Sequence, residues 1–262
     1  MKRTKNLLLI IDMQNDFCHP QGTLFVPGAE EDVHRVAAFI HKNSEFIDQI
    51  VMTQDNHHPL DIAHPGFWRN AQGDQPQPFS QLTAEEVENG SWQPRMEPQK
   101  VFTYLKALYE KQEYPHTIWP EHCLIGSWGA AIKDELMHAV ASWARQGKYY
   151  QMVTKGRYPF SEHFGALRAN IPDPQVPETE MNQPLVQTLK AYEHVYIAGE
   201  AKSHCVANTL KQLLDLKLSN QLHVLKDTMS DVPGLGYLGE PIYENAKQLG
   251  VKFETSDKVL ED

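Results

Sequence analysis

The sequence has few cysteines. Among its 262 residues only Cys18, Cys123 and Cys205 are cysteines, and no two of them form a CxxC pair. Three cysteines cannot all be paired within one chain, and small secreted domains held by disulfides carry many more. The sequence therefore favours a reduced, cytoplasmic setting in which a thiol is free to react.

Long hydrophobic runs are also missing. The first apolar run, residues 7–11, contains five residues and ends at Asp12. A membrane-spanning helix needs about 20 apolar residues, and the hydrophobic region of a signal peptide is also longer than this run. We expect this segment to be a buried first strand, and we expect no membrane partner.

No cluster of lysine and arginine stands out along the chain. The 24 basic residues are outnumbered by 34 acidic ones, which gives a formal net charge of −10. Nucleic-acid binding depends on basic surfaces, so we expect no nucleic-acid partner. A hydrophobic fraction of 41% and a charged fraction of 22% are typical of a globular protein. A small molecule is the expected partner.

The sequence alternates between strand patterns and helix patterns. A continuous apolar segment at 6–12 is followed by a helical pattern at 29–46 with acidic residues in its first turn, and then by a second buried strand at 48–55. A strand, a helix and a strand in this order predict a right-handed crossover between parallel strands. The alternation returns after residue 128, with helices at 128–147, 185–192, 204–216 and 240–249 and strands at 149–155, 194–200, 221–227 and 251–255.

These elements predict an α/β fold. We expect three layers, α-β-α, around a six-stranded, mainly parallel, Rossmann-like sheet. The segment 66–118 interrupts the alternation with Gln, Pro, Trp and Glu and contains a helical pattern at 100–112. We interpret the chain, 1–262, as one domain with an insertion at 66–118; a small cap domain in that segment is the alternative. Ligands of such sheets bind beyond the carboxyl ends of the strands.

Three residues that could do chemistry follow predicted strands. Cys205 opens a predicted helix, where the helix dipole favours a thiolate and free N–H groups can hold an oxyanion. Asp12 ends the first strand and could act as a general base. Lys155 ends another strand and could stabilise negative charge. The alternatives are a buried structural cysteine, a loop-capping aspartate and a solvated surface lysine.

Histidines crowd one segment of the chain. Residues 53–68 contain Asp55, His57 and His64, and a later segment, 119–123, contributes His122. Asp-x-His places two potential ligands on the same side of an extended segment. One carboxylate with two or three imidazoles suits zinc, iron or manganese. The alternative is a polar loop that is rich in histidine.

Five motifs together resemble those of one family. They are 11-IDMQNDF-17, 55-DNH-57, 119-WPEHCLIGSWGA-130, 155-KG-156 and 199-GEAKSHCVANT-209. They occur in the order found in nicotinamidases, which belong to the isochorismatase-like cysteine hydrolase superfamily. The resemblance covers residues 6–250 apart from the insertion, and it implies the isochorismatase-like hydrolase fold.

The resemblance also implies residue roles. Asp12 is similar to the family's general base, Lys155 to its triad lysine and Cys205 to its nucleophile. Ala201, expected to follow a cis peptide bond, would share the oxyanion hole with Cys205. Asp55, His57 and His122 match the family's metal ligands, and His64 matches a histidine that completes or borders the metal shell. Phe17 and Trp119 match the aromatic residues that hold a pyridine ring between them.

The implied activity is hydrolysis of a small carboxamide, nicotinamide to nicotinate and ammonia, through a thioester. One divalent metal ion, expected to be zinc with iron or manganese as alternatives, would orient the substrate. Glu200, Lys202 and Phe164 depart from the family pattern, so an N-carbamoyl or ureido-type amide is the main alternative substrate. An isochorismatase-type hydrolase and a non-catalytic binding protein are further alternatives. Homo-oligomers are common in the family, and one is expected here.

Overall fold

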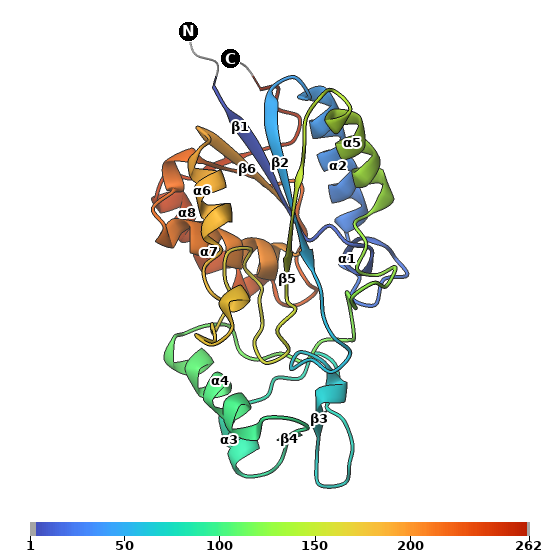
Figure 1. Cartoon of the computed structure of the whole chain (residues 1–262), viewed down its shortest axis with the longest axis vertical. Helices are drawn as coiled ribbons and strands as arrows, with labels where there is room; N and C mark the ends of the chain where they lie inside the picture. The colour runs from blue at the N-terminus through green and yellow to red at the C-terminus, as the bar shows by residue number, and fades with distance from the viewer. Residues whose placement is uncertain (1–3, 261–262) are drawn as a thin grey trace.

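A six-stranded sheet forms the centre of the molecule in the computed structural model, which describes residues 4–260 (Figure 1). The strand order is β5-β2-β1-β6-β7-β8, and every pairing in this sheet is parallel. The strands are β1 Asn6–Ile11, β2 Ile47–Asp55, β5 Gln151–Lys155, β6 His194–Gly199, β7 Leu222–Leu225 and β8 Lys252–Glu254. The predicted six-stranded parallel sheet is confirmed.

The central strand β1 is buried along its whole length. All six of its residues are buried, because neighbouring strands pair with it on both edges and helices cover both faces. Continuous apolar runs of this kind are typical of parallel strands that are covered on both sides. The active-site candidates Asp12, Asp55 and Lys155 stand at the same carboxyl edge, because β2 pairs with β1 and β5 pairs with β2 in parallel.

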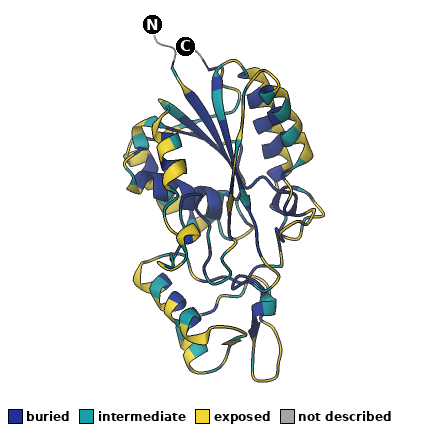
Figure 2. Ribbon diagram, in the orientation of Figure 1, coloured by how far each residue is buried: buried dark blue, intermediate teal, exposed yellow. Residues whose placement is uncertain are grey.

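Two helical layers enclose the sheet. Figure 1 shows α2 and α5 on one face and α6, α7 and α8 on the other, and Figure 2 shows their exposed outer sides. The predicted acidic first turn of α2 is present, and its Asp32 is buried. The helices are α1 Asn15–Cys18, α2 Ala29–Lys42, α5 Asp134–Ala144, α6 Gln183–Lys190, α7 Ala207–Asp215 and α8 Glu240–Gln248, with 3-10 turns at Pro177–Thr179, Ser219–Gln221 and Gly236–Leu238.

The helix predicted from residue 128 begins later than expected, at Asp134. The preceding segment is held in a turn and loop by α1, since the Asp16 amide donates to the Gly129 carbonyl and the Asn15 side chain donates to the Trp128 carbonyl. A Cβ atom at Gly129 would lie 2.0 Å from the Asp16 carboxylate. This close approach, which local helix propensity does not reveal, overrides the helical pattern.

The segment between β2 and α5 carries its own elements beyond the carboxyl edge of the sheet (Figure 1). Its helix α4 matches the helical pattern at 100–112, whereas the short helix α3 and a two-stranded antiparallel pair were not predicted from the sequence. The elements are a 3-10 turn at Pro65–Phe67, β3 Trp68–Arg69, α3 Ala84–Glu88, β4 Gln93–Pro94 and α4 Pro98–Glu110. A separate hydrophobic cluster, which includes Trp68, Val101 and Leu105, stabilises them. No helix within residues 4–260 is long and apolar enough to cross a membrane.

Candidate active site

Cys205 lies in a turn that follows β6. The sequence predicts a helix from residue 204, but residues Lys202–Val206 form a wider π-helical turn that leads into α7. The Ala201 carbonyl accepts hydrogen bonds from the amides of His204 and Val206. The Cys205 amide, which lies between them in the sequence, does not donate to this carbonyl. The peptide bond between Glu200 and Ala201 is cis, as the resemblance implied. π-helical turns are often found at functional sites.

Gly199 brings this turn close to Asp12. Its φ is +132°, and a Cβ atom there would lie 2.2 Å from the Ile11 carbonyl oxygen. Only glycine allows two backbones to approach this closely in this conformation. The end of β6 therefore packs directly against the end of β1, and Cys205 comes within reach of the residues at the carboxyl edge.

Lys155 connects the carboxylates and the thiol. Its Nζ lies 2.8 Å from Asp12 Oδ2, 3.3 Å from Asp55 Oδ1 and 3.7 Å from Cys205 Sγ. It also donates a hydrogen bond of 2.9 Å to the His163 carbonyl. All three residues of the predicted triad are buried and lie together.

Thr53 holds the Asp12 carboxylate in place. The Thr53 hydroxyl donates to Asp12 Oδ1 over 2.6 Å, and the Asp12 amide donates back to Thr53 Oγ1 over 3.0 Å. Asp12 has a φ of +43°, a left-handed conformation that is uncommon for residues other than glycine. Thr53 was not predicted as a site residue. Because residues i and i+2 of a strand share a face, its position two residues before Asp55 is the signal that could have identified it.

Burial sets the protonation of the triad. Burial raises the pKa of the Cys205 thiol well above its ordinary value, against the opposing effect of the Lys155 ammonium. Burial also raises the pKa of Asp12, while Lys155 and the Thr53 hydroxyl lower it. Burial would lower the pKa of Lys155, but Asp12 and Asp55 outweigh this effect and raise it, so the lysine stays charged. A neutral thiol therefore lies beside a potential base and a permanent cation.

The predicted metal ligands also come together. The ligand atoms of Asp55, His57 and His122 all lie within 4.8 Å of one another, and all three residues are buried. His64 lies beside them, with its ring centroid 5.1 Å from that of His57 and 5.2 Å from that of His122. Its Nδ1 is buried without a hydrogen-bond partner among the described residues.

The surroundings of the two ligand histidines fit a metal ion. Asp61 Oδ2 lies 3.2 Å from Nδ1 of His57, and the Pro120 carbonyl lies 2.8 Å from Nδ1 of His122. A proton on each Nδ1 leaves both Nε2 atoms free as ligands, and such outer partners fix ligand histidines in metal sites. One carboxylate and two imidazoles with this support suit a divalent transition metal. Asp61 was not predicted from the sequence, although it lies within the histidine-rich run.

A second group of potential ligands, Asp12, Asp55 and Cys205, overlaps this set. The Lys155 ammonium already stands against both of its carboxylates. A second cation there would meet the charge of this lysine, so the histidine set is the better metal site.

A narrow pocket of about 30 Å³ opens between the thiol and the metal ligands. Phe17 and Trp119 line it, as do Phe164, His204 and Ala201. The aromatic rings meet edge to face, with the His204 centroid 5.0 Å from that of Trp119 and 5.4 Å from that of Phe164. The pocket therefore combines flat aromatic walls with a nucleophile.

Glu162 adds a carboxyl group to this pocket. It is buried, and its Oε1 accepts a hydrogen bond of 3.2 Å from Nε1 of Trp119. Burial raises its pKa to about 8. No sequence signal marked Glu162, because it follows β5 in an irregular loop and belongs to none of the motifs.

The side chains of Glu200 and Lys202 lie outside the pocket lining. Glu200 is fully buried and accepts a hydrogen bond from the Ser230 amide, whereas Lys202 pairs with Asp231 at 3.0 Å. These two departures from the family pattern therefore leave the pocket apolar on that side.

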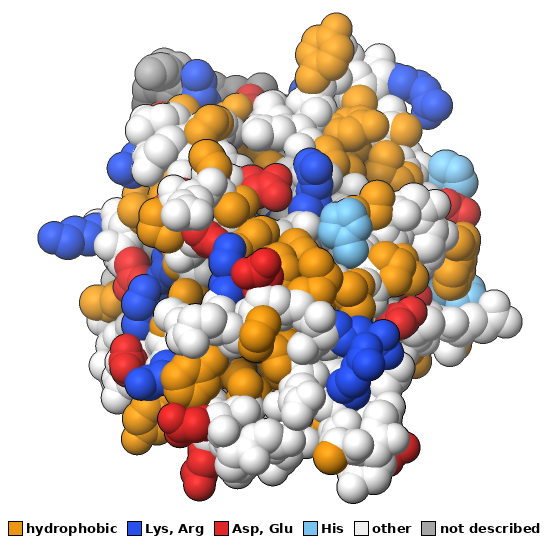
Figure 3. Space-filling view, turned by 60° about the horizontal axis from the view of Figure 1, so that its bottom comes forward, with side chains coloured by type: hydrophobic (Ala, Val, Ile, Leu, Met, Phe, Trp, Pro, Cys, Tyr) orange, Lys and Arg blue, Asp and Glu red, His pale blue; other side chains and the backbone are white. Residues whose placement is uncertain are grey.

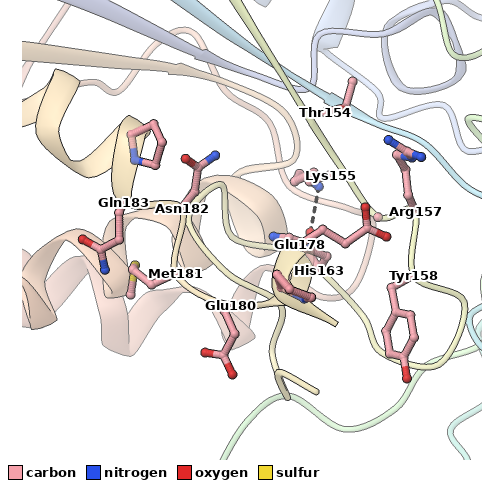
Figure 4. A pocket seen from close by; sticks show the side chains of 13 residues that line it. Thr154, Lys155, Arg157, Tyr158, His163, Glu178, Glu180, Met181, Asn182 and Gln183 are labelled. Atoms are coloured by element: carbon pink, nitrogen blue, oxygen red, sulfur yellow. Dashed lines mark hydrogen bonds between the residues drawn. The ribbon is translucent and has the colours of Figure 1, made fainter. Parts of the chain in front are cut away.

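A separate cavity of about 350 Å³ lies beside the end of β5 (Figure 4). Lys155 and His163 border it, and the side chains of Arg157, Glu178 and Glu180 stand around it (Figure 4). It contains neither the thiol nor the metal ligands, so the chemistry belongs to the smaller pocket. Figure 3 shows basic and acidic side chains interspersed among hydrophobic ones on the face that includes the insertion.

Comparisons with known proteins show what the chain is similar to. No family model matches the chain. The chain is 26% identical to the nicotinamidase of Saccharomyces cerevisiae over 202 residues, which cover 77% of this chain and 78% of that protein.

Solved structures share the fold. The crystal structure of the yeast nicotinamidase Pnc1p bound to the inhibitor nicotinaldehyde matches with a TM-score of 0.67 and 20% identity, over 95% of this chain and 99% of that chain. The pyrazinamidase of Pyrococcus horikoshii in complex with zinc matches with a TM-score of 0.55 and 18% identity, over 96% and 99%. The predicted isochorismatase-like hydrolase fold is confirmed.

Proposed function

We propose that this chain, a nicotinamidase-like member of the isochorismatase-like hydrolase superfamily, hydrolyses the carboxamide of nicotinamide to nicotinate and ammonia. The reaction would proceed through a thioester on Cys205. The contact of one ammonium, that of Lys155, with Asp12, Asp55 and Cys205 carries this proposal. This ammonium joins a nucleophile, a base and a metal ligand in one buried cluster.

In the first half-reaction Asp12 accepts the proton of the Cys205 thiol as Sγ attacks the carboxamide carbon. The transfer must accompany the attack, because burial keeps the resting thiol neutral. Lys155 then offsets the negative charge that develops on sulfur. Asp12 returns the proton to the amide nitrogen, the C–N bond breaks and ammonia leaves.

The oxyanion of the tetrahedral intermediate needs hydrogen-bond donors. We assign this role to the backbone amides of Ala201, which precedes the π-helical turn, and of Cys205, which lies within it. Preorganised backbone donors stabilise a developing oxyanion strongly in a site from which water is excluded.

In the second half-reaction water replaces ammonia. Asp12 removes a proton from this water, its hydroxide attacks the thioester carbon, and the C–S bond breaks. The proton on Asp12 then returns to the departing sulfur, so that the carboxylate of the base and the thiol are both regenerated. Phe17 and Trp119 would hold the ring of the substrate between them throughout.

Asp55, His57 and His122 would hold one divalent ion, and His64 would border it. We propose zinc, on the basis of this ligand set and of the zinc complex of the Pyrococcus horikoshii pyrazinamidase. Such an ion supplies Lewis acidity that binds and orients a ring nitrogen. Asp61 and the Pro120 carbonyl orient the two histidines for this purpose.

We also propose that the chain is a single hydrolase domain carrying the 66–118 insertion. Its three cysteines are free and buried, which agrees with a reducing, cytoplasmic setting.

Ammonia release from a panel of small amides, measured with zinc-loaded enzyme, tests the proposed substrate. The panel contains nicotinamide, a carboxamide without a ring nitrogen and an N-carbamoyl amine. We expect nicotinamide to have the highest kcat/KM. Turnover of the N-carbamoyl amine alone would refute the nicotinamidase assignment and retain the amidohydrolase chemistry. No turnover of any amide would refute both.

A further inference from the structure

Glu200 is a fully buried acid that lies two residues before the π-helical turn Lys202–Val206, the nucleophile turn. Its amide donates to the Ile11 carbonyl over 2.9 Å, which ties the turn to the end of β1. Its Oε2 accepts a hydrogen bond of 3.1 Å from the Ser230 amide. Its Oε1 is buried without a hydrogen-bond partner among the described residues.

Asp32 of α2 is the acid nearest to Glu200 in this hydrogen-bond network, because both carboxyl groups accept from Ser230, Glu200 from its amide and Asp32 from its hydroxyl. Asp32 is also buried, and its Oδ2 accepts a hydrogen bond of 2.5 Å from the Ser230 hydroxyl. Its Oδ1 accepts from Arg35 Nη1 over 3.0 Å. Arg35 thus pairs with Asp32, and no cation pairs with Glu200 among the contacts of the described residues. Two buried carboxyl groups beside each other favour retention of a proton.

We propose that Glu200 is a positioning residue, held as a neutral carboxylic acid whose Oε1–H donates to Asp32. Through this bond Glu200 ties the nucleophile turn to α2 and to the loop at 228–231. The catalytic consequence rests on the proposed amide hydrolysis. The shared proton is a property of the fold and can be tested without any substrate.

Two further backbone bonds on either side of Ala201 reach the same loop. The Lys202 amide donates to the Ser230 carbonyl over 2.9 Å, and the Gly199 amide donates to the Thr228 carbonyl over 3.2 Å. The Ala201 amide, an assigned oxyanion donor, lies between these two anchors. Loss of the Glu200 bond would therefore shift a donor that must be placed accurately, and a shift of about 1 Å can cost about a hundredfold in rate.

Several charged or titratable groups surround Glu200. They are Cys18 of α1, Asp32 and Arg35 of α2, Lys202 and Asp231 near the turn, and Tyr243 of α8. Burial first, and then Asp32, raise the pKa of Glu200 well above its ordinary value. When folding raises the pKa of a carboxyl group, the free energy of unfolding falls as the pH rises above the pKa that the group has in the unfolded chain.

Two variants and a control test the proposal. Glu200→Gln keeps a donor at this position at every pH, whereas Glu200→Leu has a similar size and no donor. Lys202→Met removes the ammonium that pairs with Asp231 and leaves the backbone bonds of the turn in place. We expect Glu200→Leu to lower kcat about ten- to a hundredfold with little change in KM. Glu200→Gln and Lys202→Met should stay within about threefold of the wild type.

Infrared spectroscopy tests the proton without substrate. Near neutral pH the wild type should show a carbonyl band of a protonated carboxylic acid that is absent from Glu200→Gln. Glu162→Gln is the control, because burial also raises the pKa of Glu162. The free energy of unfolding of Glu200→Gln, relative to the wild type, should rise with pH. A folded Glu200→Leu with unchanged kcat, or a Glu200→Gln as impaired as Glu200→Leu, would overturn the positioning role. A protonated-acid band that is unchanged in Glu200→Gln would show that Glu200 does not carry this proton. Failure of the wild type to hydrolyse any amide would instead refute the proposed function, and the infrared result would still stand.

Discussion

The hydroxyl group of Thr53 donates a 2.6 Å hydrogen bond to the carboxylate of Asp12, on the oxygen that does not face Lys155. The two Asp12 oxygens therefore have different partners: Oδ1 accepts from the Thr53 hydroxyl, and Oδ2 faces the Lys155 ammonium. This bond favours the ionised form of Asp12, the form that can accept a proton from the thiol.

Replacement of Thr53 by valine removes this bond and keeps the shape of the side chain. The Asp12 pKa should rise further, because Thr53 opposes the effect of burial on it. The base must be ionised to act, so the acid limb of the kcat/KM profile should move to higher pH. The buried carboxylate oxygen left without a donor should also cost about 1–3 kcal/mol of stability. The measurements are pH–rate profiles and urea unfolding.

Thr154→Val is the matched control, since Thr154 lies one position before Lys155 and its side chain is exposed. We expect its acid limb and stability to match the wild type. An acid limb that stays in place in Thr53→Val would show that Asp12 is not the base.

Lys155→Met should be damaging in two ways. Removal of the ammonium leaves Asp12 and Asp55 as buried carboxylates without a cation, and a broken buried ion pair costs about 3–5 kcal/mol. Lys155 also lowers the pKa of the Cys205 thiol, so its loss should slow alkylation of Cys205 by iodoacetamide. The rate of alkylation is measured by mass spectrometry at several pH values. A variant that is folded and alkylated at the wild-type rate would contradict the role of Lys155.

The Asp61 carboxylate is expected to support the metal site through His57. Asp61→Asn keeps the size of the side chain but weakens the acceptor that holds Nδ1 of His57. Loss of such an outer partner lowers metal affinity by about 10- to 100-fold. Competition for zinc with a chromophoric chelator measures the change. Asp74→Asn, an exposed aspartate of the insertion, should bind zinc as the wild type does. Equal affinities in both variants would remove the metal assignment at His57.

Phe79 links the insertion to the pocket wall. Its ring meets that of Trp119 edge to face, with centroids 5.9 Å apart, and it adopts a left-handed φ of +69° that is unusual for a bulky residue. Asn tolerates this conformation, so Phe79→Asn should remove the ring without adding strain. We expect a higher KM for nicotinamide, little change in kcat and altered Trp119 fluorescence. Tyr109→Ala, on the exposed side of α4, is the control; an identical KM in both variants would exclude a role for Phe79.

Much of the fold can be predicted from hydrophobic patterns along the sequence. The apolar run of β1 predicted a strand covered on both faces, and the parallel order placed Asp12, Asp55 and Lys155 at one edge. The residues that the sequence did not reveal depend on tertiary contacts. Glu162 reaches the pocket from an irregular loop, and its environment exists only when Trp119 packs against it.

The start of α5 could not be predicted from the sequence either. Residues 128–133 have a helical composition, yet hydrogen bonds to α1 and the close approach of Gly129 to Asp16 hold them as a loop. The nucleophile turn is similar. Its sequence predicted a regular helix start, but the link to β1 through Gly199 and the contacts of Glu200 accompany a wider turn there. In both places long-range backbone contacts decide the conformation.

The covalent intermediate tests the central claim most directly. Zinc-loaded enzyme is mixed with nicotinamide, quenched with acid within the first turnovers and analysed by intact-mass and peptide mass spectrometry. We predict a mass gain equal to the nicotinoyl group on the peptide that contains Cys205, and a loss of both the adduct and about a thousandfold or more of the ammonia release in Cys205→Ala. Ammonia release by Cys205→Ala at the wild-type rate, with no adduct in the wild type, would contradict the account.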